Sequence, residues 1–464
     1  MSSSALQVGQ SGLVFSGSIQ RQLLNAIGSS TLLSKKRPAE DNDGPSMEGS
    51  ERHKVAKGAV HPFFSKSSKE PKTTNAFQWH KALGARSSCL YGTNLIPACS
   101  PKVAAFDLDG TLIKPSFGKG AVKKALKGSP PAWEWWKDKV PNTLKDLNSE
   151  GYSIVIISNQ AIKGASLITW KEKIGLIAAA LPSVPFRILA AIAKDEYRKP
   201  MPGMWTELTK KFKDEGVEID KTASFFVGDA AGRDSDFAST DRKWALNVDL
   251  PFFTPEEYFL KQPVQTKFKL DGFSVVDLPT LPLFSLDTPV IPDIRQREIV
   301  VLVGYPGVGK STICQRYFVS RGYERINQDT LGTRPKCVAA VEKALQKDLS
   351  CVVDNTNRDV QTRKFYVDVA RKFKVPIRCF VFSGSIELAW HNNLYRAFNQ
   401  PPSTASQEEK RALVPYLAFT SFRNGYEEPT LSEGFSEIQT VNWVFEGTEE
   451  ERKYWSMWLQ IQGK

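Results

Sequence analysis

The sequence predicts an α/β protein with two successive domains, each built on a mostly parallel β-sheet. Short apolar segments alternate with longer helix-like segments, which is typical of such sheets. This pattern occurs twice, over residues 76–261 and 297–464, and residues 262–296, rich in Pro, Asp and Thr, form a linker between them. Residues 1–75 are rich in Ser, Gly and Lys without a sustained apolar period, so we expect a disordered tail there.

The composition is that of a globular protein, and it excludes several classes. Of the 464 residues 41% are hydrophobic and 24% charged, which excludes fibrous and wholly disordered proteins. No run of 18 apolar residues occurs, so no membrane span is expected. Six cysteines form no Cys-x-x-Cys pair, which argues against a disulfide scaffold or structural zinc site. The net charge of +12 permits a polyanionic partner without requiring one.

The expected strands are short apolar runs, and the expected helices lie between them. In the first domain we expect strands at residues 103–108, 153–157 and 225–227, and helices at residues 132–150, 166–180 and 203–214. In the second domain we expect strands at residues 298–303, 350–354 and 377–382, and helices at residues 311–320 and 361–373.

Two aspartates, Asp107 and Asp109, directly follow the first expected strand, and Gly110 begins a turn. Ligands of parallel sheets bind at the carboxyl ends of strands, so both carboxylates can reach one pocket. One can attack phosphorus to form an aspartyl-phosphate, while the other protonates the leaving oxygen and later deprotonates water. Because two carboxylates repel a phosphate, this chemistry requires a divalent cation, and oxygen-only ligation favours Mg²⁺.

Three later motifs supply the other groups that such a reaction needs. Ser158 and Asn159 end the second expected strand and offer a hydroxyl and an amide to phosphate oxygens. Lys199 precedes a proline and offers a cation, and Asp229 ends the third strand, where it is suited to a metal. Three further aspartates are candidates to support the metal, and their spacing does not choose among them: Asp234, Asp236 and Asp241.

The second domain opens with a loop of the pattern G-x-x-x-x-G-K-S, which follows an expected strand and begins a helix. Backbone N–H groups of such a loop cradle phosphate oxygens, Lys310 reaches the β- and γ-phosphates, and the Ser311 hydroxyl ligates Mg²⁺. The loop therefore predicts a nucleoside triphosphate, with ATP as phosphoryl donor. The candidate nucleotide-binding residues are Gly304, Tyr305, Pro306, Gly307, Val308, Gly309, Lys310, Ser311 and Thr312.

The loop does not name the acceptor of the phosphoryl group. Asp329 is a candidate base for an acceptor hydroxyl, or equally a helix cap. Asp354, at the end of a strand, is a candidate to assist the metal or the acceptor. Arg396, on a polar helix, is a candidate lid over the transferring group, and the alternative is a solvated charge.

In combination, these motifs resemble the eukaryotic polynucleotide kinase 3′-phosphatase family over roughly residues 76–445. The first half by itself is similar to haloacid dehalogenase-type phosphatases. The likeness to the two-domain family is strengthened by the sequences VGDAAGR in the first half and VVDNTN and HNNLYR in the second. The resemblance implies a haloacid dehalogenase-like Rossmannoid domain followed by a P-loop kinase domain. It further implies an enzyme that removes a 3′-phosphate from broken DNA ends and phosphorylates the 5′-hydroxyl, using Mg²⁺ and ATP.

The resemblance also implies a role for each matching residue. In the phosphatase half the nucleophile is Asp107, the general acid–base Asp109, the phosphate-binding residues Ser158, Asn159 and Lys199, and the metal ligands Asp107, Asp109 and Asp229. In the kinase half the base is Asp329, the lid arginine Arg396, the metal ligand Ser311, and the substrate or metal shell residue Asp354. Two departures stand out: the first 75 residues are too few for the forkhead-associated domain of animal members, and Ser158 stands where relatives often have Thr.

Other readings of the sequence remain open. A fused small-molecule kinase and phosphatase would use the same motifs, and RNA ends would undergo the same two reactions. A scaffold with degenerate sites is disfavoured because all the charged catalytic positions are present.

Signals in the tail bear on location and partners. The basic cluster at residues 35–38 indicates nuclear import, whereas residues 1–39, without Asp or Glu, also fit a mitochondrial transit peptide. The adjacent Phe63 and Phe64 are a candidate contact for a repair protein. We expect a monomer that binds DNA ends and no membrane.

Overall fold

The computed structural model describes residues 76–115, 130–286, 288–292, 296–405 and 411–460. The expectations for the tail, including the basic cluster, the transit peptide and the two phenylalanines, lie outside the described residues. Within the described ranges no helix is long and apolar enough to cross a membrane. The six cysteines are free thiols.

The first domain contains a seven-stranded sheet in the order β1-β2-β5-β4-β3-β6-β7. The strands are β1 (Phe77–Trp79), β2 (Cys89–Asn94), β3 (Val103–Phe106), β4 (Ser153–Asn159), β5 (Phe186–Ala191), β6 (Phe225–Val227) and β7 (Phe252–Phe253). The five strands from β5 to β7 pair in parallel, whereas β2 is antiparallel to both β1 and β5. The predicted mostly parallel sheet is thus confirmed.

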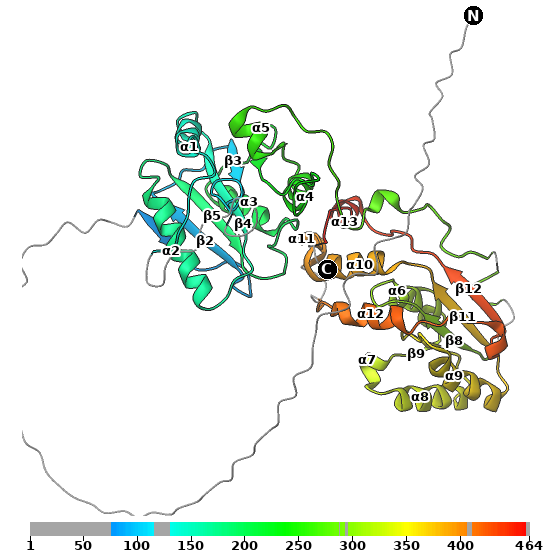
Figure 1. Ribbon diagram of the computed structural model, residues 1–464. Helices are drawn as coiled ribbons and strands as arrows, with labels where there is room; N and C mark the ends of the chain where they lie inside the picture. The colour runs from blue at the N-terminus through cyan, green and yellow to red at the C-terminus, as the bar shows by residue number, and fades with distance from the viewer. Residues whose placement is uncertain (1–75, 116–129, 287, 293–295, 406–410, 461–464) are drawn as a thin grey trace, which may run out of the picture. The chain divides into compact units, whose positions relative to one another are not determined.

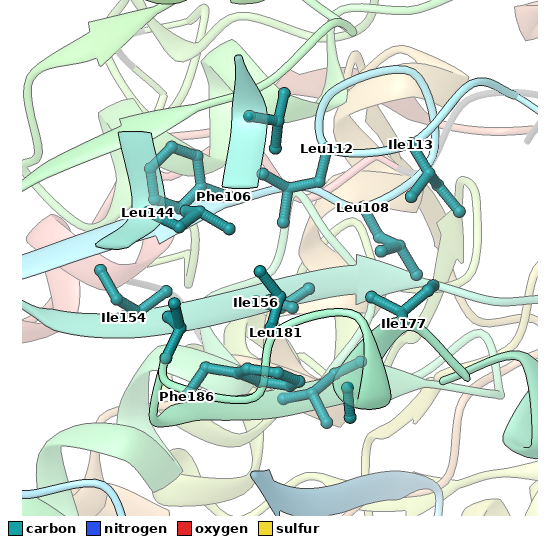
Figure 2. Packing of buried hydrophobic residues seen from close by; sticks show 14 of the residues in the cluster. Phe106, Leu108, Leu112, Ile113, Leu144, Ile154, Ile156, Ile177, Leu181 and Phe186 are labelled. Atoms are coloured by element: carbon teal, nitrogen blue, oxygen red, sulfur yellow. The ribbon is translucent and has the colours of Figure 1, made fainter. Parts of the chain in front are cut away.

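Helices cover both faces of this sheet, because alternate residues of its inner strands point to opposite faces. The helices are α1 (Val140–Ser149), α2 (Ala165–Ala179), α3 (Gly203–Asp214), α4 (Thr240–Asn247) and α5 (Pro255–Leu260). Ala104 and Phe106 of β3 pack with α1, α2 and α5, while Val103 and Ala105 pack with α3 and α4. Figure 2 shows the first of these clusters, in which Phe106, Leu144 and Ile156 converge.

Two expected helices differ in extent from the observed ones. The helix expected at 132–150 begins only at Val140, because the preceding backbone pairs with another segment: Trp136 N donates to Leu112 O and Lys114 N donates to Glu134 O, both at 2.9 Å. The helix expected at 311–320 is regular only as α6 (Lys310–Ile313). It continues as a π-helical turn (Cys314–Phe318) and a 3₁₀ turn (Val319–Arg321).

The second domain contains a fully parallel five-stranded sheet in the order β12-β11-β8-β10-β9. The strands are β8 (Ile299–Val303), β9 (Glu324–Ile326), β10 (Cys351–Val353), β11 (Ile377–Phe382) and β12 (Glu437–Val441). The remaining helices are α7 (Gln328–Leu331), α8 (Arg334–Gln346), α9 (Val360–Phe373), α10 (Ile386–Phe398), α11 (Pro402–Ala405), α12 (Tyr416–Asn424) and α13 (Glu449–Trp455).

Helices also cover both faces of the second sheet. Val301 of β8 packs with α8 and α9, which lie side by side in Figure 1, whereas Leu302 packs with α6, α10 and α12. The segment 262–296 connects the two domains in sequence. Its described residues contain one 3₁₀ turn, at Val275–Asp277, and Phe284 forms an isolated β-bridge with Val441. The α/β prediction is confirmed in both domains.

The strand order of each sheet reverses beside the strand that carries its main motif. In the first sheet the chain runs outward from β3 to β4 and β5 on one side, and returns to β6 and β7 on the other. In the second, β8 lies between β10 and β11. Crevices form at the carboxyl ends of strands at such reversal points. Asp107 directly follows β3, and the Gly304–Lys310 loop directly follows β8.

Candidate active sites

The centre of the first site is the ammonium group of Lys199, which is buried and uses all three of its N–H donors. It donates to Asp107 Oδ1 at 2.6 Å and to the Ile157 main-chain carbonyl at 2.9 Å. The third partner is Asp241 Oδ1 at 2.7 Å. Burial alone would lower the pKa of Lys199, but the carboxylates of Asp107 and Asp241 raise it, so the ammonium stays charged.

The carboxylates of Asp107 and Asp241 form a cluster with that of Asp229, with ligand oxygens within 4.8 Å of one another. Burial raises the pKa of Asp107 to about 7 against the opposing effect of Lys199, and burial raises the pKa of Asp229 too. One ammonium cannot balance three crowded carboxylates, so the site suits a hard divalent cation with oxygen ligands. Of the three aspartates left open by the spacing, the geometry selects Asp241, whereas Asp236 pairs with Arg233.

Asp241 owes its position to the backbone around it. It lies in the first turn of α4, and its Oδ2 accepts a hydrogen bond from Ala230 N at 3.0 Å. The glycines beside the site make room for the carboxylates. A Cβ on Gly110 would lie 2.2 Å from Asp229 Oδ2, and one on Gly228 would lie 2.5 Å from Asp241 Oδ2.

The carboxylate of Asp109 lies apart from this cluster and is held by two other side chains. Its Oδ2 accepts from Gln160 Nε2 at 2.7 Å, and its Oδ1 lies 3.4 Å from Lys173 Nζ. The same Gln160 amide donates to Ser158 Oγ at 3.0 Å. Ser158 and Asp109 therefore lie on one small network beside the nucleophile candidate.

Asn159 is tied to the main chain of Lys199. Its Nδ2 donates to Lys199 O at 3.0 Å, and its Oδ1 accepts from Lys199 N at 2.9 Å. The peptide bond that follows, Lys199–Pro200, is cis. In this arrangement Asn159 fixes the backbone from which the Lys199 side chain reaches Asp107.

In the second site the loop between β8 and α6 has the conformation that cradles phosphate. Gly307 and Gly309 adopt φ of +78° and +103°, which L side chains rarely adopt. Lys310 Nζ donates to Gly304 O at 2.8 Å and Tyr305 O at 2.5 Å, so it points into the hollow of the loop. Burial lowers the pKa of Lys310 to about 8, although the negative charge of Asp354 opposes this.

Asp354 follows β10 and is almost completely buried. Its Oδ2 accepts from both Arg325 Nε at 2.9 Å and Arg325 Nη2 at 2.6 Å. Its main-chain oxygen accepts from Asn327 Nδ2 at 2.6 Å, and Asn355 Oδ1 accepts from Gln328 N at 2.7 Å. The ends of β9 and β10 are thereby joined into one edge of the site.

Asp329 and Arg396 lie on different elements, and both are near enough to Lys310 to influence it electrostatically. Asp329 lies on α7, exposed, and its N–H donates to Asn327 Oδ1 at 2.9 Å, so Asn327 caps the helix. Arg396 lies on α10. This helix approaches the phosphate loop closely, since a Cβ added to Gly307 would lie 2.8 Å from the main-chain oxygen of Ala389. The charges of Asp329 and Arg396 both influence the pKa of Lys310.

Sequence reasoning missed two basic residues of these sites. Lys173 lies in the middle of α2 and Arg325 at an exposed position of β9, and no motif marks either of them. Asp241 was one of three open candidates. Gln160 directly follows Ser158 and Asn159 and was given no role, although its place beside this polar pair at a strand end was a usable signal.

Together, the two sites define an enzyme with a carboxylate-based phosphatase domain and a P-loop kinase domain. A family model described as "Polynucleotide kinase 3 phosphatase" matches residues 102–259, and one described as "AAA domain" matches residues 299–416. These matches confirm the predicted order of a phosphatase and a P-loop domain.

Similar proteins narrow the class. The bifunctional polynucleotide phosphatase/kinase of Schizosaccharomyces pombe is 38% identical over 366 residues, which cover 77% of this chain and 83% of the relative. The polynucleotide 3′-phosphatase ZDP of Arabidopsis thaliana is 39% identical over 35% of this chain and 24% of the relative. The chain therefore belongs to the bifunctional polynucleotide phosphatase/kinase family, as the resemblance implied.

Proposed function

We propose that this protein prepares the ends of DNA strand breaks for ligation, by removing a 3′-phosphate in the first domain and phosphorylating a 5′-hydroxyl in the second. The observation that carries the proposal is the pair of sites in one chain: Lys199 bound to Asp107 within the carboxylate cluster, and Lys310 within a phosphate loop beside Asp354. Removal and addition of phosphate by one chain serve a single purpose at a break, since ligation needs a 3′-hydroxyl and a 5′-phosphate.

In the phosphatase reaction a carboxylate oxygen of Asp107 attacks phosphorus while the bond from phosphorus to the 3′-oxygen breaks. Asp109 gives its proton to that oxygen and then takes one from the water that hydrolyses the aspartyl-phosphate, so inorganic phosphate is released. Ser158 holds a phosphate oxygen, the charge of the Lys199 ammonium offsets that of the phosphoryl group, and Asn159 fixes the backbone of Lys199.

The donor set of the first site fits Mg²⁺. We infer that Asp107, Asp229 and Asp241 hold it, since their ligand oxygens gather within 4.8 Å and a buried cluster of like charges needs a counter-ion. The cation would offset the carboxylate charge and polarise the phosphoryl oxygens. The Asp109 carboxylate is engaged by Gln160 and Lys173, which suits proton transfer better than ligation.

In the kinase reaction the 5′-oxygen attacks the γ-phosphorus of ATP, the bond to the β-phosphate oxygen breaks, and ADP leaves. Asp329 accepts the proton of the 5′-hydroxyl. Lys310 and Arg396 offset the charge on the transferring group, and the Ser311 hydroxyl would hold the Mg²⁺ that accompanies ATP, which would neutralise phosphate charge. The exposure of Asp329 on a short helix suits contact with a large substrate.

The finer features of the proposal are a tail over residues 1–75, a phosphatase domain over 76–261, a linker over 262–296 and a kinase domain over 297–464. We further propose a nuclear monomer, whose tail contacts a repair protein. Nuclear location agrees with the basic cluster at residues 35–38 and with DNA as substrate.

The test uses a nicked DNA duplex with 3′-phosphate and 5′-hydroxyl ends, incubated with Mg²⁺ and ATP, each end being followed separately. We expect the wild type to convert both ends, Asp107→Asn to lose only the 3′ reaction, and Lys310→Ala to lose only the 5′ reaction. Matched controls are Asp249→Asn and Lys364→Ala, whose side chains form exposed ion pairs with residues that belong to neither site.

Conversion of neither end, with hydrolysis of a small phosphate ester retained, would refute DNA as substrate and favour the small-molecule enzyme. Faster conversion of the same nick in an RNA strand would refute the preference for DNA. Chelation of Mg²⁺ should stop both reactions, and added Mg²⁺ should restore them.

A further inference from the structure

Lys173 is a buried cation that the mechanism above does not use. It lies on α2 among Trp170, Ile174 and Ile177, on the face that packs into the core of the first domain. Its side chain is only 9% exposed. Burying an ammonium in apolar surroundings costs free energy unless a charge of opposite sign compensates it. The position therefore points to a function for the charge.

The partner of this ammonium is the carboxyl group of Asp109. Lys173 Nζ lies 3.4 Å from Asp109 Oδ1, while Gln160 Nε2 donates to Asp109 Oδ2 at 2.7 Å. Each carboxylate oxygen thus has its own donor, on a separate element: α2 for Lys173, and the loop after β4 for Gln160. Two donors on separate elements fix both the place and the rotation of the carboxyl group.

We propose that Lys173 is a positioning residue for Asp109, and that it favours proton transfer from Asp109 to the leaving 3′-oxygen. The inference rests on the proposed role of Asp109 as the general acid. When the bond from phosphorus to oxygen breaks, the proton moves from Asp109 to the 3′-oxygen and Asp109 becomes an anion. The charge of Lys173 stabilises that anion at 3.4 Å.

Lys173 lies farther from Asp109 than Gln160 does. A close charge-assisted hydrogen bond measures about 2.7–2.9 Å and would hold the ionised carboxylate firmly. The looser contact stabilises the anion by charge while the short bond from Gln160 sets the direction of the group. Stabilisation of the Asp109 anion by Lys173 matters most for a leaving group that needs a proton, such as a sugar oxygen.

The experiment compares two leaving groups in the full-length protein. A 3′-phosphorylated oligonucleotide releases an alcohol and needs the acid, whereas p-nitrophenyl phosphate releases a stable phenolate and does not. For Lys173→Met we expect kcat to fall about 30-fold on the oligonucleotide, part of the roughly 10²–10⁴-fold that a general acid contributes, with KM and the p-nitrophenyl rate nearly unchanged. Lys173→Arg should restore most of the oligonucleotide rate.

The matched control is Lys171→Met, on the same helix, whose ammonium lies over the Trp79 ring instead, 5.5 Å from its centroid. Both rates should stay at the wild-type level. An equal loss on both substrates by Lys173→Met would overturn the proposal in favour of a merely structural role, unless the milder Lys173→Gln shows the selective loss. No loss on the oligonucleotide would overturn it outright.

Asp109→Asn separates failure of the inference from failure of the proposed function. A selective loss on the oligonucleotide by Asp109→Asn, without one in Lys173→Met, refutes only the role of Lys173. Because Asp109 also serves the later hydrolysis, which both substrates share, this comparison measures release of the leaving group in a single turnover. An equal loss on both substrates in that step by Asp109→Asn refutes Asp109 as the acid, and the inference then falls with it.

Discussion

Gly110→Ala is the smallest change that should disable the phosphatase and leave the kinase intact. The added Cβ would lie 2.2 Å from Asp229 Oδ2 and 2.6 Å from its Cγ, whereas real Cβ atoms essentially never approach within 3.0 Å. Asp229 must therefore move by about 1 Å. A misplacement of that size in a reacting site can cost roughly 10²-fold in rate, so we expect at least that loss of 3′-phosphatase activity.

Backbone strain must be separated from this clash. Gly110 has φ of +91°, and an L side chain in that region costs about 1–2 kcal/mol. Gly216→Ala is the matched control, because Gly216 also has a positive φ of +75°, but nothing lies within 4 Å of its added Cβ. Both variants carry similar strain, and only Gly110→Ala meets a carboxylate.

The assay measures 3′-phosphate release and 5′-phosphorylation in the same preparation, with the thermal midpoint of unfolding beside them. We expect similar small losses of stability in the two variants, a loss of phosphatase activity in Gly110→Ala alone, and unchanged kinase activity in both. Full phosphatase activity in Gly110→Ala, or an equal loss in Gly216→Ala, would refute the argument that Asp229 needs this space.

Three further predictions concern the core and the kinase site. Phe106→Ala should destabilise the first domain by about 3–5 kcal/mol in urea unfolding, because the ring is fully buried, and a change below about 1 kcal/mol would contradict the packing. The pKa of Lys310 falls from 10.5 to about 8 on folding, so the unfolded chain binds more protons than the folded chain between these pH values. The free energy of unfolding of the wild type, relative to that of Lys310→Met, should therefore rise by up to about 3 kcal/mol from pH 8 to 10.5. A relative free energy that does not change with pH would contradict the shift. Arg325→Leu should leave buried Asp354 unpaired and cost about 2 kcal/mol, less than a fully buried pair because Arg325 is 39% exposed. It should also slow the kinase alone, whereas the exposed Arg321→Leu should do neither.

The elements that the sequence predicted well are those with strong local signals. The strand before Asp107 and the one before Lys310 are short apolar runs that end in glycine-containing turns, and both occur where expected. The helix expected at 132–150 was too long, because the residues around Trp136 have an acceptable helical pattern but their backbone pairs with residues 112–114. Such long-range pairing leaves no local mark in the sequence.

The order of motifs along the chain determined the family, the α/β class and most of the candidate reacting groups, because the candidate nucleophile, the phosphate loop and their strands are contiguous in sequence. The tertiary structure decided which side chains from distant segments of the chain lie together. It chose Asp241 over its neighbours, because α4 directs that carboxylate toward Lys199. It brought Lys173 to Asp109 and Arg325 to Asp354, pairs separated by 64 and 29 residues. Charges so far apart in sequence can lie together only once sheet order and helix packing have set which faces meet, and single-sequence periodicity does not contain that information.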